Sequence, residues 1–274
     1  MQNSALSLRD GNLSQHIEAV ESRIRRAPDD ADLRAQLFQL AAVQGDWARA
    51  ADQLRLCSQF SMQSRPMAMM YSQAIDGEKQ REAVLAGTGA PSFFASRPEW
   101  CDLLVQALGA DAADPAKAAE LREQALDAAQ VCAGALTGAA EEADPEPYAW
   151  IGDGDSRLGP VCELLSGGQY GWVPFEDIGE IALLAPEGLC DVVWARAEIL
   201  LKDGRTLPGL IPARYPAAPG QRMADQEEHL RLGRVTQWRE LADGTFAGAG
   251  QKMWITDGGE FALLDVRGLR QEAA

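Results

Sequence analysis

A short acidic segment in the middle of the chain contains the residues best suited to chemistry. In WIGDGDSRLGP, residues 150–160, Asp153, Asp155 and Arg157 alternate with small residues, and Glu163 follows shortly after. Two carboxylates in one site can act as general acid and general base, so Asp153, Asp155 and Glu163 admit a hydrolase or lyase. No nucleophile, histidine or set of metal ligands accompanies them. We therefore predict no catalytic residues and no enzymatic activity.

Neither a metal site nor a phosphate site fits the spacing of this segment. Counted from Asp153, an EF-hand would need an acid or amide at position 5 and a glutamate at position 12, where the chain has Arg157 and Leu164. The glycines lack the later glycine and the lysine of a phosphate-binding loop. The two histidines, His16 and His229, are far apart, so a zinc site or a His-based triad is not expected. We predict neither a cofactor nor a metal.

An extended conformation over residues 150–157 predicts a structural role for the same side chains. Alternate residues of a strand share a face, which would place Asp153, Asp155 and Arg157 together and let the guanidinium neutralise both acids. The glycines of the segment would leave the opposite face bare, so that another backbone or an aromatic ring can approach closely. The three charged residues are candidates for a structural clamp or, alternatively, for a partner-binding surface.

The elements that must hold this segment divide the chain into two parts. Residues 1–136 show apolar side chains spaced three and four apart, which predicts a helical domain. Asp46 and Asp114 are expected N-caps, and Gly45 is an expected C-terminal cap. Further helices are predicted over 66–86, 98–109 and 115–131. The inward-facing residues expected in the first three helices are Leu13, Ile17, Val20, Ile24, Leu33, Leu37, Leu40, Ala41, Trp47, Ala50, Leu54 and Cys57.

The helical part contains a weak internal repeat. Gly11-x-Leu13 and Gly45-x-Trp47 are 34 residues apart, which is the period of a tetratricopeptide repeat, although a plain helical bundle fits as well. Trp47 is predicted to lie in the core, with ligand contact as the alternative. A methionine cluster precedes the fourth predicted helix, either as core filler or as an adaptable binding surface, and consists of Met62, Met67, Met69 and Met70.

The second part of the chain is β-rich. Residues 137–147 are small, acidic and contain proline, and they are predicted to be a linker; residues 148–274 then lose the helical period. Asp-Gly pairs at 203–204, 243–244 and 257–258 indicate hairpins. Five of the seven tryptophans lie here, including Trp172, which suits the core of a small sheet. We predict an α+β protein of two segregated domains, the second a curled antiparallel sheet or a partly open barrel.

Charge and composition restrict the partners. With 25 basic and 41 acidic residues the net charge is −16, a field that repels nucleic acid and anionic lipid. No apolar run approaches the length of a membrane helix, and the first residues do not resemble a secretory signal. Five cysteines without a CxxC spacing are expected to be reduced and mostly buried. We predict a cytoplasmic protein with a protein partner.

Several motifs occur in a fixed order along nearly the whole chain. They are GDWARAADQL at 45–54, REAVLAG at 81–87, RPEW at 97–100, WIGDGDSRLGPVCE at 150–163, YGWVPF at 170–175, LCDVVWARAEILLKDG at 189–204, IPARYP at 211–216, TQWRE at 236–240 and GAGQKMW at 248–254. Taken together they resemble the ImpE family, also called SciE-type or TagJ, of bacterial type VI secretion accessory proteins. The chain departs from the family pattern at Gly152 and Gly154, where alanine is expected.

The resemblance implies a non-enzymatic cytosolic protein with a tetratricopeptide-like N-terminal domain and a distinctive C-terminal domain. It implies binding to the N-terminal helix of the small contractile-sheath subunit, TssB, and a link to sheath handling by the ClpV ATPase. It supplies no catalytic residues. From the residues alone, helix pairs of this period form grooves that suit an amphipathic helix.

Two rival interpretations stay open at this point. One is the hydrolase or lyase described above. The other is a general tetratricopeptide co-chaperone that binds peptide C-termini through a basic clamp, for which the candidate arginines are Arg25, Arg26, Arg34, Arg49 and Arg55.

Overall fold

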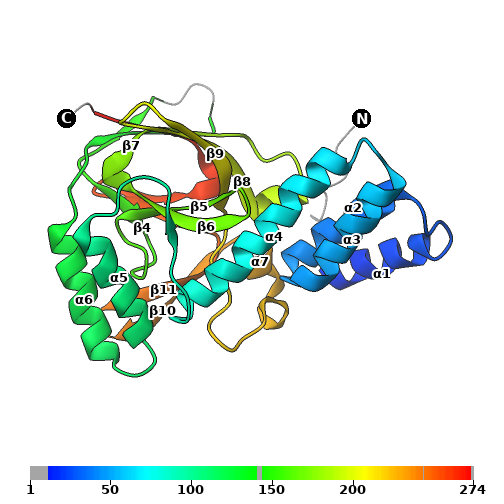
Figure 1. The fold of residues 1–274 in the computed structure, drawn as a ribbon, viewed down its shortest axis with the longest axis horizontal. Helices are drawn as coiled ribbons and strands as arrows, with labels where there is room; N and C mark the ends of the chain where they lie inside the picture. The colour runs from blue at the N-terminus through cyan, green and yellow to red at the C-terminus, as the bar shows by residue number, and fades with distance from the viewer. Residues whose placement is uncertain (1–11, 141–143, 243, 273–274) are drawn as a thin grey trace.

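A curled sheet with one group of helices to its right and a helix pair at its lower left builds the fold (Figure 1). The computed structural model describes residues 12–140, 144–242 and 244–272, and within them seven α-helices accompany one large and two small sheets. The helices are α1 (Leu13–Ile24), α2 (Ala31–Val43), α3 (Trp47–Phe60), α4 (Arg65–Leu85), α5 (Glu99–Ala110), α6 (Pro115–Ala128) and the short α7 (Glu228–Arg231). The mixed α+β class predicted from the sequence is confirmed.

The first three helices form where the apolar periodicity predicts them. Their inward-facing side chains are buried as expected, except that Trp47 is half-buried. Asp46 caps α3 by accepting a hydrogen bond from the Arg49 amide at 3.0 Å. Gly45 ends α2 with a φ of +68°, and a β-carbon there would lie 2.6 Å from the Met223 side chain. The turn therefore needs glycine for both conformation and space.

The later helices also follow the predicted ranges within a few residues. Asp114 caps α6 through the Lys117 amide at 3.0 Å, with Pro115 as the first helical residue. α4 is the longest helix and runs along the large sheet, packing on β5 (Val161–Ser166) and β6 (Gln169–Pro174) (Figure 1). α5 and α6 pack against each other as an antiparallel pair at the far end.

The large sheet has nine strands in the order β1-β6-β5-β9-β8-β7-β14-β2-β3. All neighbours are antiparallel except β1 and β6, and the edge strands β1 and β3 do not pair with each other, so the curled sheet is not closed. Asp-Gly turns at 203–204 and 257–258 join paired strands as predicted, whereas Asp243 lies outside the described residues. The remaining strands of this sheet are β1 (Ser92–Phe93), β2 (Gly134–Gly138), β3 (Glu146–Tyr148), β7 (Ile178–Leu183), β8 (Trp194–Leu201), β9 (Thr206–Pro212) and β14 (Val266–Gln271).

Two small sheets hold the acidic segment against the large sheet. One is a three-stranded sheet in the order β13-β12-β4, and the other is the hairpin β10-β11. Their strands are β4 (Ile151–Asp153), β10 (Thr236–Ala242), β11 (Thr245–Gly250), β12 (Met253–Thr256) and β13 (Gly259–Ala262). Because β12 pairs with β4, residues about 100 positions apart in sequence meet at the acidic segment.

The helices and the large sheet share the largest buried hydrophobic cluster, and a second large cluster lies within the β-rich part. The largest buried cluster runs from Leu13 in α1 through Trp172 in β6 to Leu232 after α7. Arg214 is buried beside it and donates to the carbonyls of Val43 at 2.6 Å and Ala42 at 2.7 Å, which caps the C-terminus of α2 from the sheet side. Burial lowers the pKa of this guanidinium to about 10.

The expected linker takes part in the large sheet. Residues 137–138 belong to β2 and residues 146–147 to β3, and these two strands pair with each other. The segment therefore contains the end of one strand and the start of its partner. Residues 141–143 lie outside the described part of the chain. The division into two domains at 137–147 stays a prediction. The tetratricopeptide assignment also stays a prediction, and Gly11 of its 34-residue spacing lies outside the described residues.

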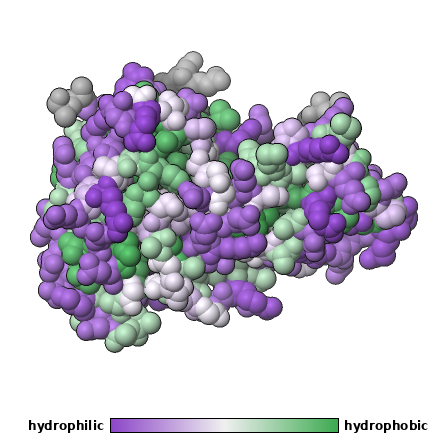
Figure 2. All heavy atoms as spheres, in the orientation of Figure 1, coloured by the Kyte–Doolittle hydropathy of each residue, from purple (hydrophilic) through white to green (hydrophobic). Residues whose placement is uncertain are grey.

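The surface is mostly hydrophilic, with hydrophobic atoms gathered over the middle of the curled sheet on the face shown in Figure 2. No helix in the described residues has the length and apolar character needed to cross a membrane. All five cysteines are buried and free.

Candidate functional site

The acidic segment is a pair of turns and not the extended strand expected from its alternating pattern. β4 ends at Asp153, whose carboxylate accepts the Asp155 amide at 2.9 Å, and Asp155 in turn accepts the Arg157 amide at 3.0 Å. Such side-chain bonds to the amide two residues ahead compete with strand pairing and stop the ladder. Asp153 and Asp155 therefore point to different partners, and the expectation that Arg157 neutralises both is wrong.

Asp155 and Arg157 form a closed, buried ion pair. The Arg157 Nε and Nη2 atoms donate to the two carboxylate oxygens at 2.9 and 2.6 Å, and both residues are nearly inaccessible. The Gly248 amide of β11 adds a hydrogen bond at 2.9 Å. Against the desolvation by burial, Arg157 and these amides lower the pKa of Asp155. The pair fixes the turn to the hairpin β10-β11.

Asp153 is paired with a lysine from the distant β11–β12 connection. Its carboxylate binds the Lys252 ammonium and accepts the Tyr215 hydroxyl at 2.9 Å. Lys252 is fully buried and reaches Glu163 at 2.7 Å as well, so one cation serves two carboxylates. Burial, aided by the charges of Glu163 and Asp155, raises the pKa of Asp153 to about 6 despite the attraction of Lys252.

Glu163 is the centre of the buried charges. Arg81 of α4 donates to both of its oxygens at 2.7 and 2.8 Å, and Tyr170 donates at 2.7 Å. Arg81 and Lys252 hold the pKa of Glu163 far below its usual range even though burial opposes this. Trp172 is fully buried and donates its indole N–H to the Tyr170 hydroxyl at 2.8 Å, so this candidate residue supports Glu163 from the core.

Glu78, a carboxylate on α4, extends the cluster. Glu78 accepts the Trp194 indole N–H at 2.9 Å and lies 3.4 Å from Arg81, and burial raises its pKa. The buried charge cluster is defined here as four carboxylates and three cations, namely Glu78, Asp153, Asp155, Glu163, Arg81, Arg157 and Lys252. It joins α4, β4, β5, the acidic turns and the start of β12 in one hydrogen-bonded unit.

The glycines of the segment allow close approach, as predicted. A β-carbon on Gly154 would lie 2.6 Å from the ring of Trp238, and one on Gly152 would lie 3.1 Å from the Gly159 carbonyl oxygen. An aromatic ring and a backbone therefore occupy the space that the absent side chains leave free.

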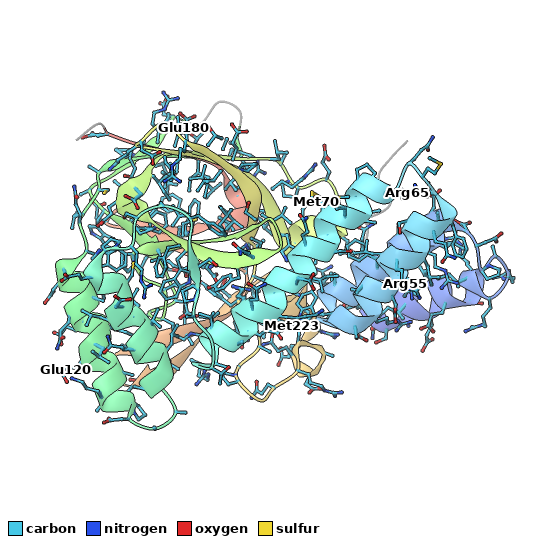
Figure 3. All side chains as sticks on the ribbon, viewed as in Figure 1. Arg55, Arg65, Met70, Glu120, Glu180 and Met223 are labelled. Atoms are coloured by element: carbon cyan, nitrogen blue, oxygen red, sulfur yellow. The ribbon has the colours of Figure 1, made fainter. Side chains whose placement is uncertain are left out.

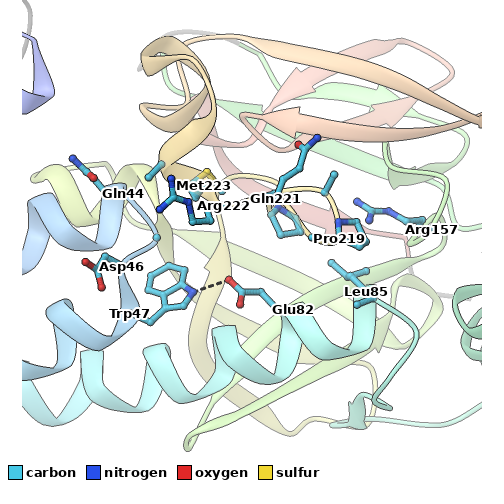
Figure 4. A pocket seen from close by; sticks show the side chains of 17 residues that line it. Gln44, Asp46, Trp47, Glu82, Leu85, Arg157, Pro219, Gln221, Arg222 and Met223 are labelled. Atoms are coloured by element: carbon cyan, nitrogen blue, oxygen red, sulfur yellow. Dashed lines mark hydrogen bonds between the residues drawn. The ribbon is translucent and has the colours of Figure 1, made fainter. Parts of the chain in front are cut away.

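The buried charge cluster adjoins a pocket of about 660 Å³ between the helices and the 216–224 loop (Figure 4). Trp47 lines one wall, packed 5.8 Å from the Trp194 ring, and donates to Glu82 at 2.7 Å. Arg157 lines the other side. The structure thus brings Trp47 and Arg157 to one pocket, while the carboxylates of Asp153, Asp155 and Glu163 do not line it.

The chemistry open to this arrangement is limited by its ion pairs. General acid–base catalysis needs a carboxyl group within reach of a bound substrate. Asp153, Asp155 and Glu163 are all buried and already accept hydrogen bonds from cations, hydroxyls or amides. Within the described residues no group of three or more His, Cys, Asp or Glu side chains is arranged so that it could hold a metal ion. The cluster instead cross-links α4, β5 and the acidic turns that follow β4.

Sequence reasoning identified Arg157 but missed the other two cations of the cluster, Arg81 and Lys252, and the Tyr215 hydroxyl that donates to Asp153. Arg81, Lys252 and Tyr215 are distant in sequence from the acidic segment, and nothing in their spacing indicates a common site. One signal was present, because Glu163 interrupts the apolar run VCELL of a buried strand, and a buried carboxylate needs a partner.

Comparison with known proteins places the chain in a family. The family model described as "ImpE protein" matches residues 145–270. A relative from Pseudomonas aeruginosa, named type VI secretion system accessory component TagJ, is 39% identical over 263 residues, which covers 96% of this chain and 88% of the relative. The chain belongs to the ImpE (TagJ) family. The resemblance stated from the ordered motifs is confirmed.

A solved structure supports the fold. A crystal structure of a Vibrio parahaemolyticus protein superposes with a TM-score of 0.84, covering 98% of this chain and 97% of that one, at 24% identity. The helices and the open curled sheet thus recur together in a protein of low sequence identity. Membership of the family supports an accessory role in type VI secretion.

Proposed function

We propose that this protein is a non-enzymatic cytoplasmic adaptor of type VI secretion. In this proposal it binds the N-terminal helix of the small sheath subunit, TssB, and links the sheath to its handling by the ClpV ATPase. The observation that carries the proposal is the 39% identity, over 96% of the chain, to a protein named as an accessory component of that system.

The structure supports an adaptor in two ways. The carboxylates of Asp153, Asp155 and Glu163 form internal ion pairs, as expected for residues that hold elements together. Pockets of about 660 and 520 Å³ also lie where the helices meet the β-rich part. Pockets of this size accept several side chains of a docked segment.

The rival functions find less support. A hydrolase or lyase would need Asp153, Asp155 or Glu163 to face a substrate, and all three are buried. A co-chaperone clamp would need free arginines. Arg34 donates to the Pro28 carbonyl and to Gln53, and Arg49 is paired with Glu21. Arg26 donates to the Ser22 carbonyl and Arg55 lies 3.8 Å from Asp52, so four of the five candidate arginines already have internal partners.

Co-purification tests the proposal. The full chain should retain the intact small sheath subunit and lose it when the first helix of that subunit is deleted. A second arm adds ClpV to the purified complex and compares its retention with and without the adaptor. Equal retention of the intact and truncated subunits would show that the helix is not the recognised segment.

A further inference from the structure

An apolar groove of about 520 Å³ lies between α4 and the large sheet, where the β5–β6 turn at residues 166–168 and the neighbouring strands line it. Met70 and Ala74 of α4 form one side, and Leu165, Ala182, Leu184 and Leu210 contribute apolar side chains from β5, β7, β9 and the residue after β7. Met70 is labelled on α4 in Figure 3. We call this feature the Met70 groove.

Large apolar side chains are exposed to solvent at the Met70 groove. Leu184 is 58% exposed and Met70 is 37% exposed, and the neighbouring Met69 is 65% exposed. The pocket at Trp47 differs, because charged side chains such as Asp46, Glu82 and Arg222 line it. Of the two, the Met70 groove has the surface that the apolar face of a helix requires.

Side-chain size suits the approach of a helix. Ala74, Ala182 and Ala197 are small and leave room for larger side chains of a partner. Methionine at the rim can change rotamer and fill gaps against a partner of irregular shape. One member of the methionine cluster seen in the sequence, Met70, therefore lines the groove, and the exposed Met69 precedes it on α4.

The charge around the groove indicates the partner's charge. Residues 1–65 contain eight basic and eight acidic residues, so the whole net charge of −16 belongs to the rest of the chain, which supplies all the residues that line the groove. Glu198 lines the groove and, in the described part of the chain, has no ion-pair partner. Arg196 also lines it but is already paired with Glu187 at 2.7 Å. The groove thus offers an uncompensated carboxylate to a cationic side chain.

We propose that the Met70 groove is the docking site for the partner helix, which lays an apolar stripe against Met70, Leu184 and Leu210. The occupant is an amphipathic helix of another protein with a lysine or arginine on the flank that faces Glu198. This inference rests on the proposed function and adds to it the surface that receives the helix.

The test compares two leucines of similar exposure. Leu184→Asp changes the groove, and Leu126→Asp is the matched control on α6, where Leu126 is 53% exposed. Both positions are at the surface, so thermal melting should match the wild type. The probe is a fluorescein-labelled peptide of the first helix of the sheath small subunit, titrated in fluorescence anisotropy.

We expect Leu184→Asp to weaken binding at least tenfold, because Leu184 would be a central anchor of the contact. Leu126→Asp should leave the affinity within about twofold, because Leu126 lies outside the contact. Glu198→Lys should weaken binding at low salt, and its effect should shrink at ~0.5 M salt because the interaction is screened. If the wild type binds and Leu184→Asp binds equally well, the groove assignment is overturned while the proposed function stands. If a folded wild type does not bind, both are overturned.

Discussion

Lys252 is the residue whose removal should damage the buried charge cluster most. It is fully buried and supplies the only cation in contact with Asp153 among the described residues, while it also contacts Glu163. Lys252→Met keeps the length of the side chain but leaves Asp153 buried without a counter-charge. Losing one partner of a buried pair costs about 3–5 kcal/mol, compared with about 0–1 kcal/mol for an exposed pair.

The assay is thermal and urea unfolding of the full chain at pH 8. For a chain of this size a loss of about 3–5 kcal/mol lowers Tm by roughly 6–20 °C. The matched control is Lys117→Met, which breaks the exposed Lys117–Glu120 pair and should change Tm by no more than about 4 °C. Adding Asp153→Asn to Lys252→Met removes the stranded charge and should recover more than half of the loss.

The pH dependence gives a second readout of the same cluster. Burial raises the pKa of Asp153 to about 6, above its value in the unfolded chain. As the pH falls, the folded state therefore protonates Asp153 before the unfolded chain does. The contribution of Asp153 to the free energy of unfolding therefore increases as pH falls from about 6 towards 4. Without Lys252 this pKa rises further, so the deficit of Lys252→Met should shrink between pH 8 and pH 5. A deficit no larger than that of Lys117→Met, or one that grows on acidification, would refute the reasoning.

Three further predictions concern the acidic segment, the glycine contacts and the chain division. Asp155→Asn should lower the free energy of unfolding by about 1–3 kcal/mol, measured in urea, because Arg157 loses a buried counter-charge; an unchanged midpoint would argue against a structural role. Gly248→Ala places a β-carbon 2.3 Å from the Tyr215 ring and should cost about 1–3 kcal/mol, whereas Gly109→Ala in α5 meets no neighbour and should stabilise by roughly 0.5–1 kcal/mol. Limited proteolysis should cut first within residues 137–147, with the fragments staying associated through the shared core; a first cut deep within either half would contradict the predicted division.

The parts of the fold that depend on local pattern were predictable from the sequence. The periodicity of Leu13, Ile17, Val20 and Ile24 predicts the buried face of α1, and Asp46 and Gly45 mark the turn before α3 as the structure has it. Asp-Gly at 203–204 likewise marks the β8–β9 hairpin. In each case the residues that determine the conformation are within a few positions of one another.

The candidate site was predictable only in part, because its partners are distant in sequence. The pattern at 150–157 fits a strand, but the carboxylates of Asp153 and Asp155 bond to local amides and form turns, which alternation of side chains cannot reveal. Lys252 reaches Asp153 only because β12 pairs with β4, a contact between residues 99 positions apart. Such pairings form only when the sheet assembles, and no residue spacing in the sequence indicates them.

The most direct test of the account is whether the folded full chain binds the first helix of the sheath small subunit. A labelled peptide of that helix, titrated with the protein in fluorescence anisotropy, should give a dissociation constant on the order of micromolar, as for a helix in a groove. Much of the affinity should persist at ~0.5 M salt, because the contact is mainly apolar. No binding at ~100 μM of a sample shown by circular dichroism to be folded would contradict the proposed function.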